Sequence, residues 1–156
     1  IDGMMVKGAA NTNIVFVYYY RNKFDCLDTN LQRVYSATTI DSTGTTNLQL
    51  SPAAPGGVTR LQSLPSLINI SACIEGKRLY IRSGSFAKNE SADLLAQNAI
   101  IDVYSLSNGK YIQSLYAPRF RGRQLTAFTI VGDQFYGLYG HFIACFSIVR
   151  IRSDKQ

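Results

Sequence analysis

Residues with the chemistry for catalysis or metal binding are few in this chain and lie far apart. Its 156 residues include three cysteines, Cys26, Cys73 and Cys145, and one histidine, His141. A zinc ion requires three or four protein ligands, which often come in C-x-x-C or H-x-x-x-H pairs. Neither pattern occurs, so we expect no metal site and no bound cofactor. We interpret the cysteines as small buried hydrophobic residues.

His141 and Cys145 are the one pair that could act as base and nucleophile. They lie four residues apart in a segment with strand-like composition, which separates their Cα atoms by about 13 Å along a strand. That distance is far beyond hydrogen-bond reach, although the two side chains would share a sheet face. No G-x-S-x-G, Walker or G-x-G-x-x-G motif occurs either, so we expect no assembled catalytic residues.

Basic residues are the second group with chemical potential, because the net charge is +6. Arg119 and Arg121 lie with Arg123 in a P-R-F-R-G-R segment between two predicted strands. This charge favours an anionic ligand or partner, and we treat Arg119 and Arg121 as candidate ligand-binding residues. A solvated loop would have the same composition. Nucleic acid is disfavoured, since the other basic residues are dispersed and no recognition helix accompanies them.

Two polar segments supply further candidate ligand-binding residues. Tyr20, Arg21 and Asn22 end a Y-Y-Y-R-N string. Its rings could form a binding rim, or they could pack between sheets ahead of a polar turn. Lys88 and Glu90 open a loop insertion, and loops on a rigid β scaffold often carry recognition residues. The structural alternative for this insertion is a capped, solvated turn.

The segments that must position these residues are predicted to be β-strands. Turn dipeptides such as Asn108-Gly109 separate the apolar segments, as in hairpins. Insertions interrupt the pattern at about 42–65, which is rich in Ser, Thr, Gly and Pro, and at about 87–98, where the composition from Glu90 is helix-like. We predict one all-β domain over residues 1–156. The segments rich in β-branched and aromatic residues are 13–20, 24–27, 67–74, 78–81, 100–105, 110–116, 125–131, 135–139 and 142–151.

A weak internal repeat relates these segments once the insertions are removed. Gly76 matches Gly132, and the Leu-Tyr pair after Gly76 matches the Phe-Tyr pair after Gly132. Asp25 and Asp102 take equivalent positions, which predicts a shared structural hydrogen bond rather than acid–base chemistry.

The repeat length indicates a propeller blade. Ile101 and Phe142 are 41 residues apart, within the roughly 40 to 50 residues of a four-stranded blade. The third copy lacks a clear fourth strand. We therefore predict consecutive four-stranded antiparallel blades of a β-propeller, about two to three in number. Two or three blades cannot close a ring, so the missing blades must come from another protein chain or from a longer precursor.

At this level the chain resembles bacterial exported six-bladed β-propellers of the TolB-like and NHL-like kind, many of unknown function. The resemblance implies export to the bacterial periplasm or the outer membrane. Because long loops project from a rigid β scaffold and no catalytic residues assemble, we expect a non-catalytic binding or protein-interaction module, with an anionic or glycan ligand as one possibility. The resemblance supplies no catalytic motif. The segments that carry it are Tyr18–Asn22, Asp28–Leu31, Thr39–Asp41, Ala87–Glu90, Ile101–Tyr104 and Asn108–Tyr111.

Two other functions fit the same pattern. The chain could be part of a polymer-degrading hydrolase or lyase whose active site at the propeller axis is shared with the missing blades. Arg82, Asp102 or His141 could contribute to that site, and Arg82 is also a candidate ligand-binding residue. Alternatively, the chain is the structural half of a multi-chain assembly. No apolar segment reaches the roughly 18 residues of a transmembrane helix, so we expect none.

Overall fold

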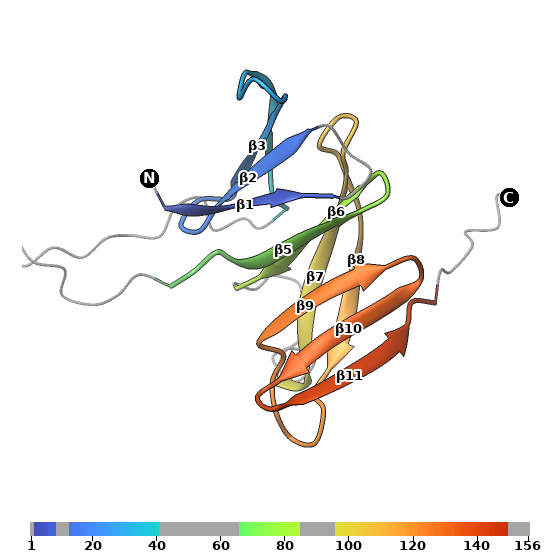
Figure 1. The fold of residues 1–156 in the computed structure, drawn as a ribbon. Coiled ribbons are helices and arrows are strands. Elements are labelled where there is room, and N and C mark those ends of the chain that lie inside the picture. Colours follow the sequence, from blue (N-terminus) through green and yellow to red (C-terminus); the bar gives the residue numbers. More distant parts are fainter. Residues whose placement is uncertain (1, 9–12, 41–65, 85–95, 150–156) are drawn as a thin grey trace, which may run out of the picture.

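The computed structural model describes residues 2–8, 13–40, 66–84 and 96–149, and these residues form an all-β structure (Figure 1). The strands belong to three antiparallel sheets in which sequence neighbours pair. The all-β prediction is therefore confirmed. The strands are β1 (Gly3–Lys7), β2 (Ile14–Tyr18), β3 (Lys23–Leu27), β4 (Arg33–Thr38), β5 (Asn69–Glu75), β6 (Arg78–Ser83), β7 (Asn98–Ser105), β8 (Tyr111–Pro118), β9 (Ala127–Val131), β10 (Gln134–Tyr139) and β11 (Phe142–Ser147).

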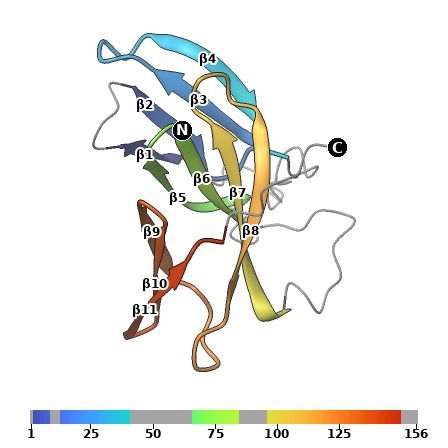
Figure 2. The ribbon, with the colours of Figure 1, turned by 90° about the vertical axis from the view of Figure 1, so that its right-hand side faces the viewer.

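The sheets follow one another along the chain. Sheet 1 has the order β1-β2-β3-β4, sheet 2 has the order β5-β6-β7-β8, and sheet 3 contains β9, β10 and β11. Among the described residues sheet 3 has three strands, as predicted. The first strands β1, β5 and β9 are neighbours along one side of the molecule, and β4 and β8 lie on the other side (Figure 2). Such an arrangement is typical of consecutive propeller blades.

Sheet 2 lies between the other two sheets and is buried on both faces. Alternation along its strands explains this, because successive side chains point to opposite faces of a sheet. Leu79 and Ile81 pack toward sheet 1 together with Val15 and Phe24. Tyr80, which lies between them on β6, packs instead toward sheet 3. The two hydrophobic clusters thus hold three sheets in one stack.

Sheets 1 and 2 share details that confirm the predicted repeat. Asp25 on β3 is paired with Ser36 on β4 and accepts a hydrogen bond from its Oγ. Asp102 on β7 is paired with Ser114 on β8 and accepts the same bond at 2.6 Å. The third and fourth strands also shift register just beyond each aspartate. The two aspartates therefore have the structural role that the sequence predicts.

The aspartates also show that the sheets stack in one direction. On β7, Asp102 is paired with Ile81, so it lies on the face that packs toward sheet 1. On β3, Asp25 is paired with Phe16, on the face opposite to the buried Val15 and Val17. Each aspartate therefore lies on the side of its sheet that is turned away from the sheet that follows in the chain.

The structure differs from the predicted strands at a few positions. β1 and β4 lie outside the predicted strand segments. The GMMVK sequence of β1 lacks aromatic residues and becomes a strand by pairing with β2, and β4 forms by pairing with β3. The segment predicted from 142 to 151 ends its strand at Ser147, and the strand expected over 13–20 ends at Tyr18. The insertion at 42–65 lies outside the described residues. Of the insertion at 87–98, residues 96–97 are helical and Asn98 already begins β7.

Asp25 makes the stability of sheet 1 sensitive to acid. Burial acts to raise the pKa of Asp25, but hydrogen bonds from Ser36, Tyr18 and Lys23 outweigh it and hold the pKa below its usual value. A carboxyl group with a lowered pKa stabilises the fold above its unfolded pKa of about 3.9, and this contribution is lost as the pH falls through its folded pKa.

We expect Asp25→Asn to lower the free energy of unfolding at pH 7 by about 1–3 kcal/mol. The variant should also have a flatter pH dependence below about pH 4. Urea unfolding of both proteins from pH 7 to pH 2.5 measures this difference. Parallel pH profiles for the two proteins would show that Asp25 does not cause the acid sensitivity.

Candidate functional site

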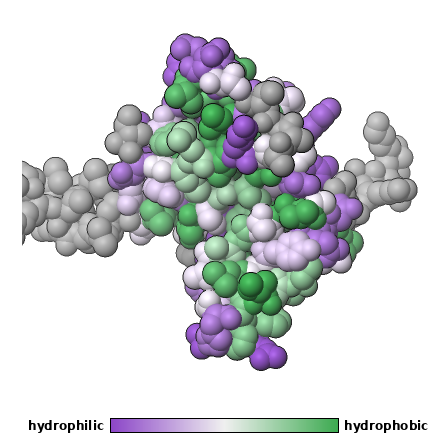
Figure 3. All heavy atoms as spheres, in the orientation of Figure 1, coloured by the Kyte–Doolittle hydropathy of each residue, from purple (hydrophilic) through white to green (hydrophobic). Residues whose placement is uncertain are grey.

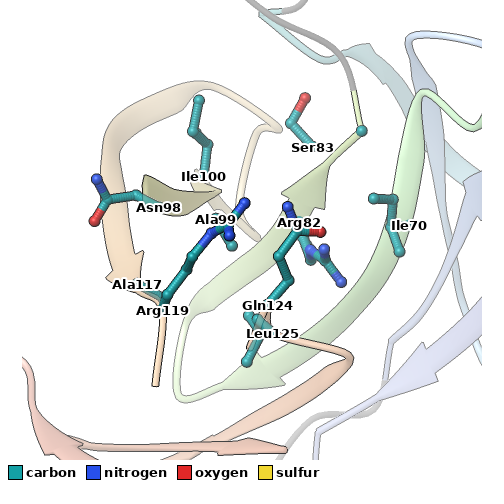
Figure 4. A pocket seen from close by; sticks show the side chains of 11 residues that line it. Ile70, Arg82, Ser83, Asn98, Ala99, Ile100, Ala117, Arg119, Gln124 and Leu125 are labelled. Carbon is teal, nitrogen blue, oxygen red and sulfur yellow. The ribbon is translucent and has the colours of Figure 1, made fainter. Parts of the chain in front are cut away.

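A small cavity lies where sheet 2 meets the connection from β8 to β9 (Figure 4). Its volume is about 190 Å³. Apolar side chains from three strands and the connection form much of its wall, and two arginines reach it. The lining residues are Ile70, Arg82, Ser83, Gly84, Asn98, Ala99, Ile100, Ala117, Arg119, Gln124 and Leu125.

Arg82 is positioned in the cavity by β6. Its side chain lies on the same face of the strand as Tyr80, which places it between sheets 2 and 3. It is partly buried, and burial lowers the pKa of Arg82. Its Nη1 lies 3.5 Å from the backbone oxygen of Thr126, which is a long hydrogen bond. Within the described ranges, most of the guanidinium donors are therefore left for another partner.

Arg119 reaches the cavity from the residue after β8. Its backbone N–H donates to the oxygen of Gln97 at 2.9 Å, which fixes the chain at this point. The next residue, Phe120, packs its ring against the rings of Tyr139 and Phe142, with centroids 5.8 and 6.3 Å away. Phe120 therefore anchors the connection to sheet 3, and the exposed Arg119 lines the same cavity as Arg82.

The positive charge in the cavity is not balanced by the described part of the chain. The ion pair found in the described residues joins Lys23 to Asp25 on β3, at 3.3 Å. No carboxylate lines the cavity. Arg82 and Arg119 have no carboxylate partner among the described residues. This arrangement attracts anions, because apolar walls strengthen the field of a charge.

The other candidate ligand-binding residues are spread over different places. Arg21 and Asn22 line a more open cavity of about 650 Å³ beside β4 and the turn before β8, whereas Tyr20 packs against Tyr19. Arg121 lies in a turn, with its Cζ 5.0 Å from the centroid of the Phe142 ring. Lys88 and Glu90 lie outside the described residues. The structure thus brings together only Arg82 and Arg119 in the smaller cavity.

The residues suggested for catalysis do not converge in the described structure. His141 lies in the turn before β11 rather than in a strand, and its ring packs on Phe142 at 4.2 Å. Cys145 lies within β11, and the Asp102 carboxylate accepts a hydrogen bond from Ser114. None of these three lines the Arg82 cavity. The described residues also contain no group of three His, Cys, Asp or Glu side chains suited to a metal ion.

The outer face of sheet 3 is a second candidate surface. Apolar side chains gather on it, as Figure 3 shows for the face turned toward the viewer. Ile143 is 75% exposed, and Val131 is 60% exposed. Tyr136 and Leu138 are also exposed.

Cys145 lies on this same face, as its pairing with Tyr136 indicates. The expectation that all three cysteines are buried holds for Cys26, is only partly met by Cys73 and is wrong for Cys145, which is exposed. The physical reason is that none of the described residues forms a further sheet on the outer face of sheet 3.

Comparison with known proteins adds no family to this description: neither a protein-family model nor a curated protein matches the chain. In the part of the chain that the structure describes, no helix has the length and apolar character to cross a membrane.

Proposed function

We propose that this chain is a segment of a β-propeller that serves as a non-catalytic binding and protein-interaction module. In this proposal the outer faces of sheets 1 and 3 pack against further sheets of the same repeat. One observation carries it. Ile101 on sheet 2 and Ile143 on sheet 3 occupy equivalent positions, but Ile101 is fully buried at 0% exposure and Ile143 is 75% exposed.

Other equivalent pairs support the same conclusion. Tyr80 on β6 is 4% exposed and packs toward sheet 3, whereas its counterpart Tyr136 on β10 is 38% exposed. Val103 is fully buried, and its counterpart is the exposed Cys145. A sheet face with apolar side chains at these positions is suited to a further sheet, because the chain already uses the same positions for that purpose.

The outer face of sheet 1 fits the opposite side of this arrangement. It carries Phe16 and Tyr18, whose rings pack edge to face at 4.9 Å, and the exposed Met5. By the repeat, this face corresponds to the side of sheet 2 that packs on sheet 1. The outer faces of sheets 1 and 3 therefore carry apolar and aromatic side chains at the positions that meet where two described sheets pack together.

The further sheets would come from another protein chain or from a longer polypeptide that contains this segment. The resemblance to exported six-bladed propellers supports a full ring of six blades and a place in the bacterial envelope, in the periplasm or at the outer membrane. The binding role rests on the rigid stack of sheets, which holds two cavities with basic linings.

Cys145 offers a direct test, because it lies on the outer face of sheet 3. We expect a maleimide to modify Cys145 slowly in the natively purified protein, at least tenfold more slowly than it modifies free N-acetylcysteine. Burial raises the pKa of Cys73 to about 12, so Cys73 should not react at neutral pH. A Cys145→Ser variant is the control that identifies the modified thiol by intact mass.

The same sample is measured by size-exclusion chromatography with light scattering. Protection of Cys145 together with a mass above 17.3 kDa supports the proposal, and the co-eluting polypeptides identify the source of the further sheets. A folded 17.3 kDa monomer whose Cys145 reacts as fast as N-acetylcysteine overturns it.

A further inference from the structure

Arg82 occupies a position where the repeat otherwise places an apolar residue. Phe16 pairs with Asp25 as Ile81 pairs with Asp102, so the next residues, Val17 and Arg82, are equivalent. Val17 is fully buried between sheets 1 and 2. In sheet 3 the equivalent residue is Leu138, which pairs with Ile143 as Arg82 pairs with Ile101. Sheet 2 alone has a charge at this position among the three described sheets.

A charge at this place is costly unless something binds it. A guanidinium group loses hydration when it is buried beside apolar side chains, and the loss must be offset by hydrogen bonds or an opposite charge. The long bond to the Thr126 oxygen offsets little of this cost. No carboxylate in the described residues pairs with Arg82, and Leu or Val would fill the position at lower cost. The contacts of the described residues therefore do not explain why this residue is an arginine.

A second arginine reaches the same cavity, although its own side chain is exposed. Arg119 enters the same cavity from the end of β8, and the Gln124 side-chain amide extends into it from the connection to β9 (Figure 4). An anion in the cavity could accept hydrogen bonds from both guanidinium groups, as oxyanions commonly do from paired arginines.

The size and the walls of the cavity narrow the ligand class. At about 190 Å³ the cavity is smaller than the roughly 300–1,000 Å³ of sites for drug-sized ligands. Ile70, Ile100 and Leu125 supply apolar wall beside the charged groups. A small organic carboxylate fits both features, because its carbon skeleton can contact the apolar wall while its carboxylate meets the arginines.

We propose that the cavity between sheet 2 and the β8–β9 connection binds a small organic carboxylate, with Arg82 as the principal binding residue and Arg119 as the second. A single hexuronic acid is an example of the class. This inference goes beyond the proposed function, because every residue that carries it lies in sheet 2 or in the connection to sheet 3. It would stand whether or not further sheets pack on the outer faces.

Isothermal titration calorimetry on the full chain tests the proposal. The probes are D-galacturonate, glutarate, inorganic phosphate and, as the neutral match to galacturonate, D-galactose. We expect saturable binding of at least one carboxylate and at least tenfold weaker binding of phosphate and galactose. Arg82→Leu should weaken carboxylate binding at least tenfold. Its fold should be retained, because Val17 and Leu138 occupy the equivalent positions in sheets 1 and 3.

Two further variants keep the outcome decisive. Arg119→Leu should also weaken binding at least tenfold, and it tests the site if Arg82→Leu does not fold. Lys77→Ala removes the same charge in the turn between β5 and β6, at the other end of β6, and should leave the affinity unchanged within twofold. Loss of affinity in Lys77→Ala as large as in Arg82→Leu would mean that net charge alone acts, and would overturn the site.

The remaining outcomes also decide the matter. If neither carboxylate binds saturably, the proposal is overturned. If phosphate binds more tightly than the carboxylates, the carboxylate class is wrong and the site is one for inorganic anions. Light scattering and Cys145 labelling of Arg82→Leu are expected to match those of the parent protein. If the proposed carboxylate site is wrong, the result on the association of further sheets is unaffected. If further sheets do not associate, the calorimetric test of the carboxylate site is likewise unaffected.

Discussion

Replacement of Tyr104 by alanine is expected to lower the free energy of unfolding by about 3–5 kcal/mol. Tyr104 is fully buried between sheets 1 and 2, where its ring packs on Phe24 with centroids 5.3 Å apart. Its hydroxyl also accepts a hydrogen bond from the backbone N–H of Ile40 at 3.0 Å, which ties the end of sheet 1 to sheet 2. The substitution thus leaves a cavity and an unpaired backbone donor. Urea unfolding followed by circular dichroism measures the change.

Tyr111→Ala is the matched control for this substitution. The Tyr111 ring lies 5.9 Å from that of Tyr104, but Tyr111 is 43% exposed on β8. We expect its removal to cost less than about 1 kcal/mol. Equal losses for the two variants would show that Tyr104 does not join the sheets as described.

Ile101→Ala and Ile143→Ala form the second prediction, and they compare one residue type at two equivalent positions. Ile101 is fully buried between sheets 2 and 3, so its truncation is expected to cost about 2–5 kcal/mol. Ile143 is 75% exposed, so in the monomeric chain its truncation should change stability by less than about 0.5 kcal/mol. Thermal or urea unfolding of the three proteins side by side gives both values.

The same pair also tests the proposed association of further sheets. If a further sheet packs on sheet 3, Ile143→Ala should become costly in the assembled protein and should weaken the assembly measured by light scattering. A loss of several kcal/mol for Ile143→Ala in a proven monomer would contradict the exposure of this face.

The architecture could be predicted from the sequence because the strand signals are local. Aromatic and β-branched residues mark most strands, and turns such as that at Gly109, with φ of +71°, need the glycine that the sequence provides. β1 escaped prediction because its strand conformation depends on pairing with β2, which is a tertiary effect. The exposure of Cys145 could not be predicted either, since residue type favours burial of a cysteine but the presence of a covering sheet decides it.

The candidate site could be predicted only in part. Arg82 and Arg119 were both named as candidates, but the sequence did not indicate that they meet. They are 37 positions apart, and the Phe120 anchor that brings them together acts through packing on sheet 3. Gln124 was not recognised. One signal was available, since aligning the repeats places Arg82 against an apolar residue in both neighbouring copies.

The common direction in which the sheets stack determines what an assembly of this kind can be. Because the Asp25 side of sheet 1 and the outer side of sheet 3 are different surfaces, each contact is heterologous and leaves a free donor face and a free acceptor face. A series of such contacts is not completed by two copies, as a symmetric dimer would be. If the rotation between sheets closes, the series forms a ring; if it does not close, the series continues as a filament.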